Sequence, residues 1–244
     1  MNTSTKGLVI KEQTIGESDR LVTLLTADYG LVRAFVRGAK HMKSRLASTT
    51  SLFAYCEFSL YRGKDAFVVD NASPIEVFFD LRKDIVRLAL AQYFAQLAYE
   101  LCEEEQPAPE TLSVILNALH LLCNSDKDLR LVKSAVELRL LCLGGYMPNI
   151  LACANCATYE TDLMYFDTLE GCIYCENCAK TGAMPCPKNV ITAVRFICLT
   201  EPKKIFSFSL SDENFEILSQ LTEKYLLSRV QKNLPTLVFY KGLV

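Results

Sequence analysis

Two pairs of cysteines in the chain have the spacing of a metal site. Two residues separate Cys153 from Cys156, two separate Cys175 from Cys178, and 18 residues lie between the pairs. Each pair can form a tight turn that directs both sulfurs at one ion, and two such turns complete a tetrahedron of thiolates. Because four thiolates leave no coordination position open, the spacing predicts one structural Zn²⁺ ion rather than a catalytic one.

A neighbouring cysteine offers an alternative choice of ligands. Cys172 also precedes Cys175 by three positions, and Cys175 cannot belong to both pairs without leaving Cys178 over. The Glu-Asn dipeptide between Cys175 and Cys178 favours a turn, whereas the Ile-Tyr dipeptide after Cys172 favours a strand. We therefore expect the two regularly spaced pairs to supply the four ligands, with Cys172 as the alternative.

The sequence carries no common enzyme motif beside these cysteines. It contains no GxxxxGK[ST], GxGxxG or HExxH pattern, and its two histidines, His41 and His120, are far from the cysteines along the chain. A redox CxxC motif normally lies in a βαβ unit, which the pattern around these pairs does not resemble. We expect a protein without catalytic turnover and without a small-molecule substrate.

A second group of functional residues is cationic. Residues 31–46 contain no acid and five cations, namely Arg33, Arg37, Lys40, Lys43 and Arg45. In a strand, Arg33, Phe35 and Arg37 share one face, and the apolar residues that alternate with them share the other. Guanidinium groups that neutralise phosphates, beside a ring on which a base can stack, suit a single strand of nucleic acid. We expect these five cations and Phe35 to bind nucleic acid; a solvated strand face with a polar loop is the alternative.

Charge is segregated along the chain. Residues 1–64 contain ten Lys and Arg against five Asp and Glu, a net of +5, whereas the remaining residues contain 16 against 23, a net of −7. Such asymmetry favours a nucleic-acid surface at the basic end. No apolar run approaches the ~18 residues of a membrane span, and the first residues lack a signal-peptide pattern. We expect a cytoplasmic protein. Five of its other cysteines, which have apolar neighbours in the sequence, should be buried thiols, namely Cys56, Cys102, Cys123, Cys142 and Cys198.

The periodicity of the apolar residues changes near residue 80. Before it, short apolar or alternating runs separated by turn residues predict a small closed or nearly closed β-barrel. These runs cover residues 7–11, 20–26, 31–37, 53–61 and 67–69. After it, the period is helical. The expected helices cover residues 81–101, 110–123, 128–143, 188–198 and 211–229, the last one capped by Ser211.

These elements predict an α+β protein with more than one domain. We expect a barrel domain at residues 1–80 and an α-helical domain at residues 81–244. The helical domain would carry the zinc-binding insertion at about residues 150–185, with a small hairpin between the two cysteine pairs.

The order of these features resembles the RecO family of bacterial DNA recombination-repair proteins. The resemblance rests on GESDRLVTLLTADYGLVRAFVRGAKHMKSRL at residues 16–46, on FSLYRGKD at 58–65, and on VELRLLCLGGYMPNILACANC at 136–156. Gly171, shortly before the second cysteine pair, adds to it. Beyond about residue 190 the resemblance rests only on a helical pattern.

The resemblance implies an OB-fold barrel, an α-helical bundle and a structural zinc ion. It also implies a mediator of DNA repair and homologous recombination that binds single- and double-stranded DNA and anneals complementary strands. Such a protein works with RecR and with the C-terminal tail of single-strand-binding protein to help load RecA on coated DNA. The resemblance puts the cations of residues 33–45 on the DNA-binding face. Cys172 departs from the family pattern, which has a glycine there. A zinc-ribbon adaptor that binds only proteins is the alternative function.

Overall fold

The computed structural model of the chain describes residues 2–41, 44–63 and 66–244. The chain divides into two compact units. The first contains Met1–Ser125 together with Leu234–Val244, and the second contains Asp126–Asn233. The division into domains at residues 1–80 and 81–244 stays a prediction.

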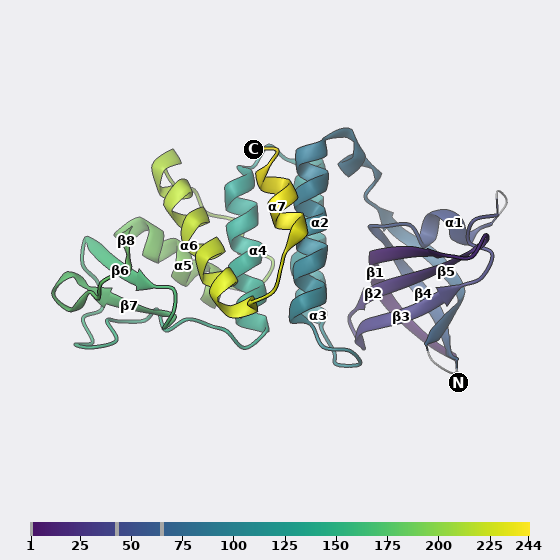
Figure 1. The fold of residues 1–244 in the computed structure, drawn as a ribbon, viewed down its shortest axis with the longest axis horizontal. Coiled ribbons are helices and arrows are strands. Elements are labelled where there is room, and N and C mark those ends of the chain that lie inside the picture. The colour runs from purple at the N-terminus through teal and green to yellow at the C-terminus, as the bar shows by residue number, and fades with distance from the viewer. Residues whose placement is uncertain (1, 42–43, 64–65) are drawn as a thin grey trace. The chain divides into compact units, whose positions relative to one another are not determined.

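Five strands of the first unit close into a barrel (Figure 1). They are β1 (Asn2–Ile15), β2 (Asp19–Thr26), β3 (Gly30–Val36), β4 (Ala54–Arg62) and β5 (Phe67–Val77). Around the barrel the order is β1-β2-β3-β5-β4, and β3 and β5 are the parallel neighbours. The predicted α+β fold with an OB-like barrel at the N-terminal end is confirmed.

The barrel forms because apolar side chains alternate along the strands and meet inside. On β4, Ala54, Cys56, Phe58 and Leu60 are buried in the barrel core, and the residues between them face outward. Burying each larger apolar side chain contributes about 1.5–3 kcal/mol. A bulge after Val9 allows the 14-residue β1 to pair with both β2 and β4, which closes the barrel.

Three helices complete the first unit. They are α2 (Ile85–Leu101), α3 (Pro109–Asn124) and α7 (Pro235–Lys241), and the shorter α1 (Leu46–Thr49) and η1 (Phe79–Lys83) lie in connections. α2 begins at Asp84, whose carboxylate accepts a hydrogen bond from the Val86 backbone N–H at 2.9 Å. α7 packs on α2, where the Gln96 amide oxygen accepts a hydrogen bond from the Thr236 backbone N–H at 3.3 Å. Figure 1 shows α7, in yellow, beside α2.

The second unit is built on α4 (Leu129–Leu143), α5 (Lys188–Leu199) and α6 (Asp212–Val230). α4 packs against both other helices, and its buried residues include the charged Lys133 and Glu137. Lys133 Nζ lies 2.8 Å from Glu137 Oε1 and 3.0 Å from Glu223 Oε2 on α6, so an ion-pair network joins the two helices. Ser211 caps α6, as expected, by accepting a hydrogen bond from the backbone N–H of Asn214.

A three-stranded sheet in the second unit contains the predicted hairpin. Its strands are β6 (Leu163–Asp167), β7 (Cys172–Cys175) and β8 (Met184–Pro187), in the order β7-β6-β8. Gly171 turns the chain from β6 into β7 with a φ of +70°. A Cβ atom there would lie 2.6 Å from Arg229 Nη2 and 2.9 Å from the Tyr225 hydroxyl, so the turn requires glycine.

Candidate metal centre and nucleic-acid surface

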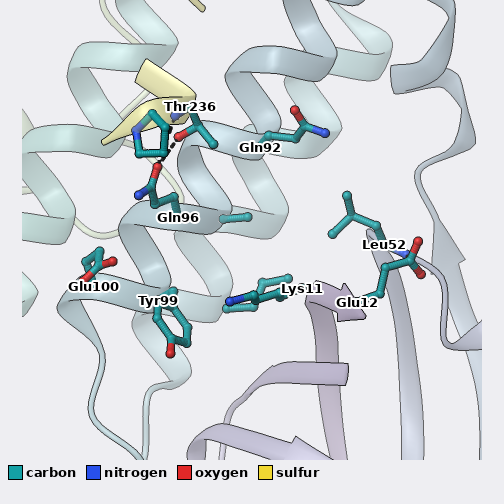
Figure 2. A pocket seen from close by; sticks show the side chains of 11 residues that line it. Lys11, Glu12, Leu52, Gln92, Gln96, Tyr99, Glu100 and Thr236 are labelled. Atoms are coloured by element: carbon teal, nitrogen blue, oxygen red, sulfur yellow. Dashed lines mark hydrogen bonds between the residues drawn. The ribbon is translucent and has the colours of Figure 1, made fainter. Parts of the chain in front are cut away.

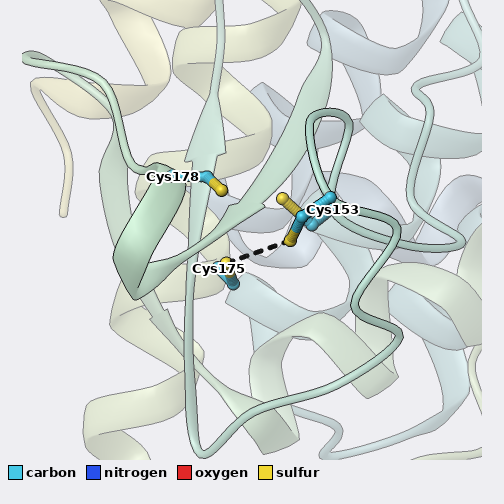
Figure 3. Close-up of side chains that lie close together, drawn as sticks. Cys153, Cys175 and Cys178 are labelled. Carbon is cyan, nitrogen blue, oxygen red and sulfur yellow. Dashed lines mark hydrogen bonds between the residues drawn. The ribbon is translucent and has the colours of Figure 1, made fainter.

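The four cysteines expected to bind metal come together in the second unit. Their Sγ atoms all lie within 4.8 Å of one another, and those of Cys156 and Cys175 are 3.5 Å apart. Figure 3 shows the sulfurs of Cys153, Cys175 and Cys178 directed toward a common centre. Cys153 and Cys175 are buried, whereas Cys156 is exposed. An ion bound by this cysteine group would therefore be accessible from one side.

Different kinds of backbone position the two pairs. The second pair lies at the ends of β7 and of the 3₁₀ turn η2 (Glu176–Cys178). The first pair lies on an irregular loop after α4, where the Ala157 N–H donates to the Cys153 carbonyl at 2.9 Å. The Ala154 N–H donates to the Ile173 carbonyl at 2.9 Å, which attaches this loop to β7. The two pairs are thus held side by side by main-chain hydrogen bonds.

Alternation along β7 turns Cys172 away from the cysteine group. Two residues three positions apart on a strand face opposite sides, so Cys172 and Cys175 cannot direct both sulfurs at one ion. The Cys172 Sγ instead lies 3.7 Å from Glu170 Oε2. The same carboxylate accepts a hydrogen bond from the Tyr174 hydroxyl and lies 2.6 Å from Lys180 Nζ. This geometry supports Cys178, and not Cys172, as the partner of Cys175.

The thiols of the cysteine group differ in acidity. Burial opposes ionisation of Cys153, but backbone N–H groups of Cys156, Cys175 and Asn155 outweigh it and lower the pKa of Cys153 to about 6. Burial, with the neighbouring sulfurs of Cys156 and Cys178, raises the pKa of Cys175 to about 11. Four thiolates this close repel one another unless a cation lies between them. Binding a metal ion should therefore expel protons.

The donor set fits a four-coordinate metal ion. Four sulfurs held at about 2.3 Å from one zinc ion lie about 3.8 Å apart in a tetrahedron. The observed separations, up to 4.8 Å, approach this arrangement, so small side-chain rotations would complete it. The group could therefore hold a metal ion, and soft thiolate ligands favour zinc among the common divalent ions of cells.

The cationic strand has the alternation predicted for it. β3 leaves Arg33 and Phe35 exposed and buries the apolar residues between and beside them in the barrel core. Phe35 keeps 36% of its surface exposed, although phenylalanine is usually a core residue. Arg37 follows the strand directly and is also exposed. The outer face of β3 thus presents a ring with a guanidinium group on either side of it in the sequence.

The loop after β3 contains further exposed cations. Lys40 and Arg45 are exposed, and Lys43 lies outside the described residues. We use the term cationic surface for the exposed set Arg33, Phe35, Arg37, Lys40 and Arg45. Its role in binding nucleic acid stays a prediction.

Asp19 positions the loop that carries Lys40, a role that the sequence did not suggest. Its carboxylate accepts a hydrogen bond from the Gly38 N–H at 2.8 Å, and the Lys40 N–H donates to the Ser18 carbonyl at 3.0 Å. The hydrogen bond from Gly38 lowers the pKa of Asp19, with help from the Ser18 hydroxyl. The turn before β2 therefore fixes the start of the cationic loop.

Arg20 is a structural residue rather than part of the cationic surface. Its Nη1 donates to the Ala47 carbonyl at 3.1 Å and to the Thr50 hydroxyl at 3.2 Å. It also lies 3.4 Å from Glu12 Oε2 on β1. These contacts occupy the guanidinium group with β1 and with the segment around α1.

Models of two protein-family domains match nearly the whole chain. "Recombination protein O N terminal" matches residues 1–78 and "Recombination protein O C terminal" matches residues 82–237. The chain belongs to the RecO family. RecO-family proteins act in DNA repair and recombination, and the first match coincides with the barrel that carries the cationic surface.

Individual relatives of the RecO family agree with this assignment. The chain is 33% identical to a "DNA repair protein RecO" of Acetivibrio thermocellus over 241 residues, which cover 98% of this chain and 96% of the relative. It is 32% identical over 219 residues to the protein of the same description from Dehalococcoides mccartyi strain CBDB1, with 89% and 85% covered. A third, from Alkaliphilus metalliredigens, is 25% identical over 230 residues, with 93% and 94% covered.

An acidic segment borders the cationic surface of this RecO-family chain. The Leu31 N–H donates to the Glu103 carbonyl at 3.2 Å, which attaches the segment after α2 to the start of β3. Arg62 Nη2 lies 3.1 Å from Glu105 Oε1. Arg33, Arg62, Glu104 and Glu105 line one small cavity of about 140 Å³. Carboxylates thus lie next to Arg33 of the cationic surface on this RecO barrel.

A larger groove of the first unit, of about 490 Å³, lies between β1, α2 and α7 (Figure 2). Lys11 Nζ lies 5.2 Å from the centre of the Tyr99 ring, and Glu12 accepts a hydrogen bond from the Leu52 N–H at 3.1 Å. The side chains that line the groove include cations, carboxylates and apolar groups. Among the described residues of this RecO-family chain that line the groove, none is a cysteine, histidine or serine that could act as a nucleophile or base.

None of the described helices of this RecO-family chain has both the length and the apolar composition needed to cross a membrane.

Proposed function

We propose that the chain is a recombination mediator without catalytic turnover. It binds single- and double-stranded DNA through the cationic surface and anneals complementary strands. With RecR it helps load RecA on DNA coated by single-strand-binding protein, whose C-terminal tail it engages. It does this work in the cytoplasm, associated with the nucleoid.

The exposure of Arg33 and Phe35 on β3, and of Arg37 directly after it, carries this proposal. Guanidinium groups neutralise phosphates and release counterions, and an exposed ring accepts a stacked base without selecting its sequence. The strands most used by OB-folds for oligonucleotides include the third strand of the barrel. Membership of a DNA-repair family makes nucleic acid the natural ligand for such a face.

Annealing follows from the same chemistry. Cations on an open barrel face hold phosphates but leave most base edges accessible, so a second strand can pair with a bound one. Neutralisation also reduces the repulsion between two phosphate backbones. The activity should therefore fall steeply as salt rises.

The zinc ion in this proposal has a structural role. Cys153, Cys156, Cys175 and Cys178 would hold it, and a closed shell of four thiolates supplies folding free energy rather than chemistry. The ion would fix the two cysteine turns of the second unit. DNA binding by the barrel would not pass through it.

The test is annealing of two complementary oligonucleotides that are coated with single-strand-binding protein. Wild type is compared with Arg33→Glu/Arg37→Glu and with a control, Lys203→Glu/Lys224→Glu, which changes the charge equally at two exposed lysines of the second unit. We expect rapid annealing by wild type and control, and its loss in the β3 variant. Circular dichroism and the melting temperature check that each variant is folded.

The other outcomes separate the alternatives. A wild-type chain that neither anneals nor is retained on oligonucleotides at low salt would favour a zinc-ribbon adaptor that binds only proteins. Equal annealing by all three chains would keep the mediator function and move the DNA site away from β3. ATPase activity that remains with the chain in a clean preparation would contradict the proposal that the protein has no catalytic turnover.

A further inference from the structure

Arg195 on α5 is a buried cation that no sequence motif singled out. Only 8% of its surface is exposed. Its Nε donates to the Ile150 carbonyl at 2.8 Å, and its Nη2 donates to the carbonyls of Leu151 and Tyr159 at 3.1 and 2.7 Å. These carbonyls lie on both sides of the first cysteine pair in the sequence. One guanidinium group therefore holds both ends of the loop that carries Cys153 and Cys156.

Further contacts fix the orientation of this guanidinium group. Its Nη1 lies 3.5 Å from Glu160 Oε2, and its Cζ lies 4.4 Å from the centre of the Tyr159 ring. Lys188, which begins α5, lies 2.8 Å from Glu160 Oε1 and supports the same carboxylate. The planar guanidinium group of Arg195 thus donates hydrogen bonds to carbonyls, pairs with an acid and contacts a ring at the same time. A lysine cannot make all of these contacts at once.

We propose that Arg195 is the positioning residue of the metal centre. By closing the loop of residues 151–159, it keeps the first cysteine pair arranged for the ion before the ion arrives. The inference rests on the proposed zinc site. It assigns to Arg195 a share of the metal affinity although Arg195 supplies no ligand atom.

The first pair needs such a residue more than the second pair does. Cys175 ends a β-strand of the three-stranded sheet, so its backbone is already fixed by the strand ladder. Cys153 and Cys156 lie on a loop without regular secondary structure. Without Arg195, only main-chain hydrogen bonds would hold this loop before the ion binds. Binding would then have to order more of the loop, and the conformational entropy lost would reduce the affinity.

The experiment measures Zn²⁺ affinity of the full-length chain by competition with a chromophoric chelator. Arg195→Lys keeps the charge but removes the planar fork. The control lies in the same unit. Arg139→Lys alters another arginine whose Nη1 donates to a backbone carbonyl, that of Cys198, at 2.7 Å. We expect Arg195→Lys to weaken zinc binding about 10- to 100-fold, the range found when groups that orient metal ligands are removed, and the control to stay near wild type.

A second readout examines the protein after zinc removal. Hydrogen exchange of the Cys153 and Ala157 amides should be faster in metal-free Arg195→Lys than in metal-free wild type, because the loop is then held only by its own hydrogen bonds. NMR of metal-free wild type adds a test that needs no variant. The Arg195 Nε–H should remain protected from exchange, since its carbonyl partner does not depend on the ion.

The outcomes distinguish the two proposals. A wild-type chain that does not bind zinc refutes the metal centre and the inference with it. Zinc binding by wild type that is matched by Arg195→Lys, or weakened equally by Arg139→Lys, refutes only the role of Arg195. Rapid exchange of the Arg195 Nε–H in metal-free wild type also refutes it, even if the lysine variant fails to fold.

Discussion

The cationic surface and the cysteine group are supported in different ways. Arg33 and Phe35 stand on a strand whose other face fills the barrel core, so apolar burial alone fixes their direction. The cysteines stand on two turns that meet through a few main-chain hydrogen bonds, and their sulfurs repel one another as thiolates. The first arrangement exists without its ligand. The second would gain stability from an ion and from the residues that hold its loops.

The largest effect should come from removing one ligand of the cysteine group. Cys175→Ser leaves three thiolates, and structural zinc contributes on the order of 10 kcal/mol in small zinc modules. We expect zinc loss and rapid amide exchange at Ala154 and Ala157. The barrel should remain unchanged, because its core contains no part of the cysteine group.

Cys172→Ser is the matched control for that variant. It changes the same atom on the same strand but on the opposite face. We expect it to bind zinc like wild type. Loss of zinc from Cys172→Ser together with retention in a Cys178→Ser variant would show that Cys172 is the ligand instead.

A smaller but still large effect should come from the buried ion-pair network between α4 and α6. Lys133→Met removes a cation that contacts the carboxylates of Glu137 and Glu223. The side chains of Lys133 and Glu137 are only 3% and 0% exposed. Removing one partner of a buried ion pair typically costs about 3–5 kcal/mol. Chemical denaturation followed by a probe in the second unit should show this loss.

A second substitution checks the physical reason for that loss. Adding Glu137→Gln to Lys133→Met removes the charge of one of the two carboxylates that Lys133 contacts and should recover part of the stability. A cost near zero for Lys133→Met alone, or a further loss in the double variant, would contradict the ion-pair account.

A modest effect is expected where Asp19 holds the cationic loop. Asp19→Asn should weaken binding of a single-stranded oligonucleotide by less than about fivefold, because contacts at exposed positions are worth little. The pKa of Asp19 is lowered in the folded chain. The stabilisation from its hydrogen bond with the Gly38 N–H is therefore complete above the ordinary aspartate pKa of about 3.9. This stabilisation is lost as the pH falls through the lowered pKa of Asp19 in the folded chain.

Exchange of the Gly38 amide measures this directly. Wild type should lose protection at Gly38 only at acidic pH, whereas Asp19→Asn should lack the change with pH. Identical pH profiles in the two chains would mean that Asp19 does not position the loop.

The smallest effect should come from the acidic segment beside β3. Glu104→Gln/Glu105→Gln removes two carboxylates beside Arg33 of the cationic surface. It also removes the ion pair between Arg62 and Glu105. Binding to an oligonucleotide should tighten about twofold at low salt and not at high salt, because these charges are exposed and screened. Glu201→Gln/Glu213→Gln, exposed in the second unit, is the control and should change nothing.

The sequence predicted what depends on local periodicity. The outward direction of Arg33, Phe35 and Arg37 follows from a period of two, and the structure has it. The hairpin between the cysteine pairs was likewise indicated by turn and strand residues. The preference for Cys178 over Cys172 rested on the same local argument, and the separation of the Cys172 sulfur from the cysteine group supports it.

Features that depend on distant partners could not be predicted. β5 runs to Val77 through Asp70, Asn71 and Pro74, which are poor strand residues, because β4 pairs with it. α7 was missed because its partner Gln96 lies 140 residues away from Thr236. Arg195 gave no signal, since a lone arginine in an amphipathic helix usually faces solvent.

Asp19 and Arg20 show why a shared sequence segment does not imply a shared role. They lie in the same family-like segment as the basic stretch, residues 16–46, yet both bind backbone or hydroxyl groups of other segments of the barrel. Their contacts could not be inferred without the closed barrel, which brings the turns at residues 16–19 and 38–41 together.

The most direct test of the central claim is the salt dependence of binding to a single-stranded oligonucleotide. Each phosphate neutralised contributes about 0.7 to the slope of log affinity against log salt concentration. Arg33→Ala/Arg37→Ala should therefore bind more weakly than wild type and with a slope shallower by about 1.4. An unchanged slope in a folded variant would show that β3 does not contact the phosphates, and would contradict the account.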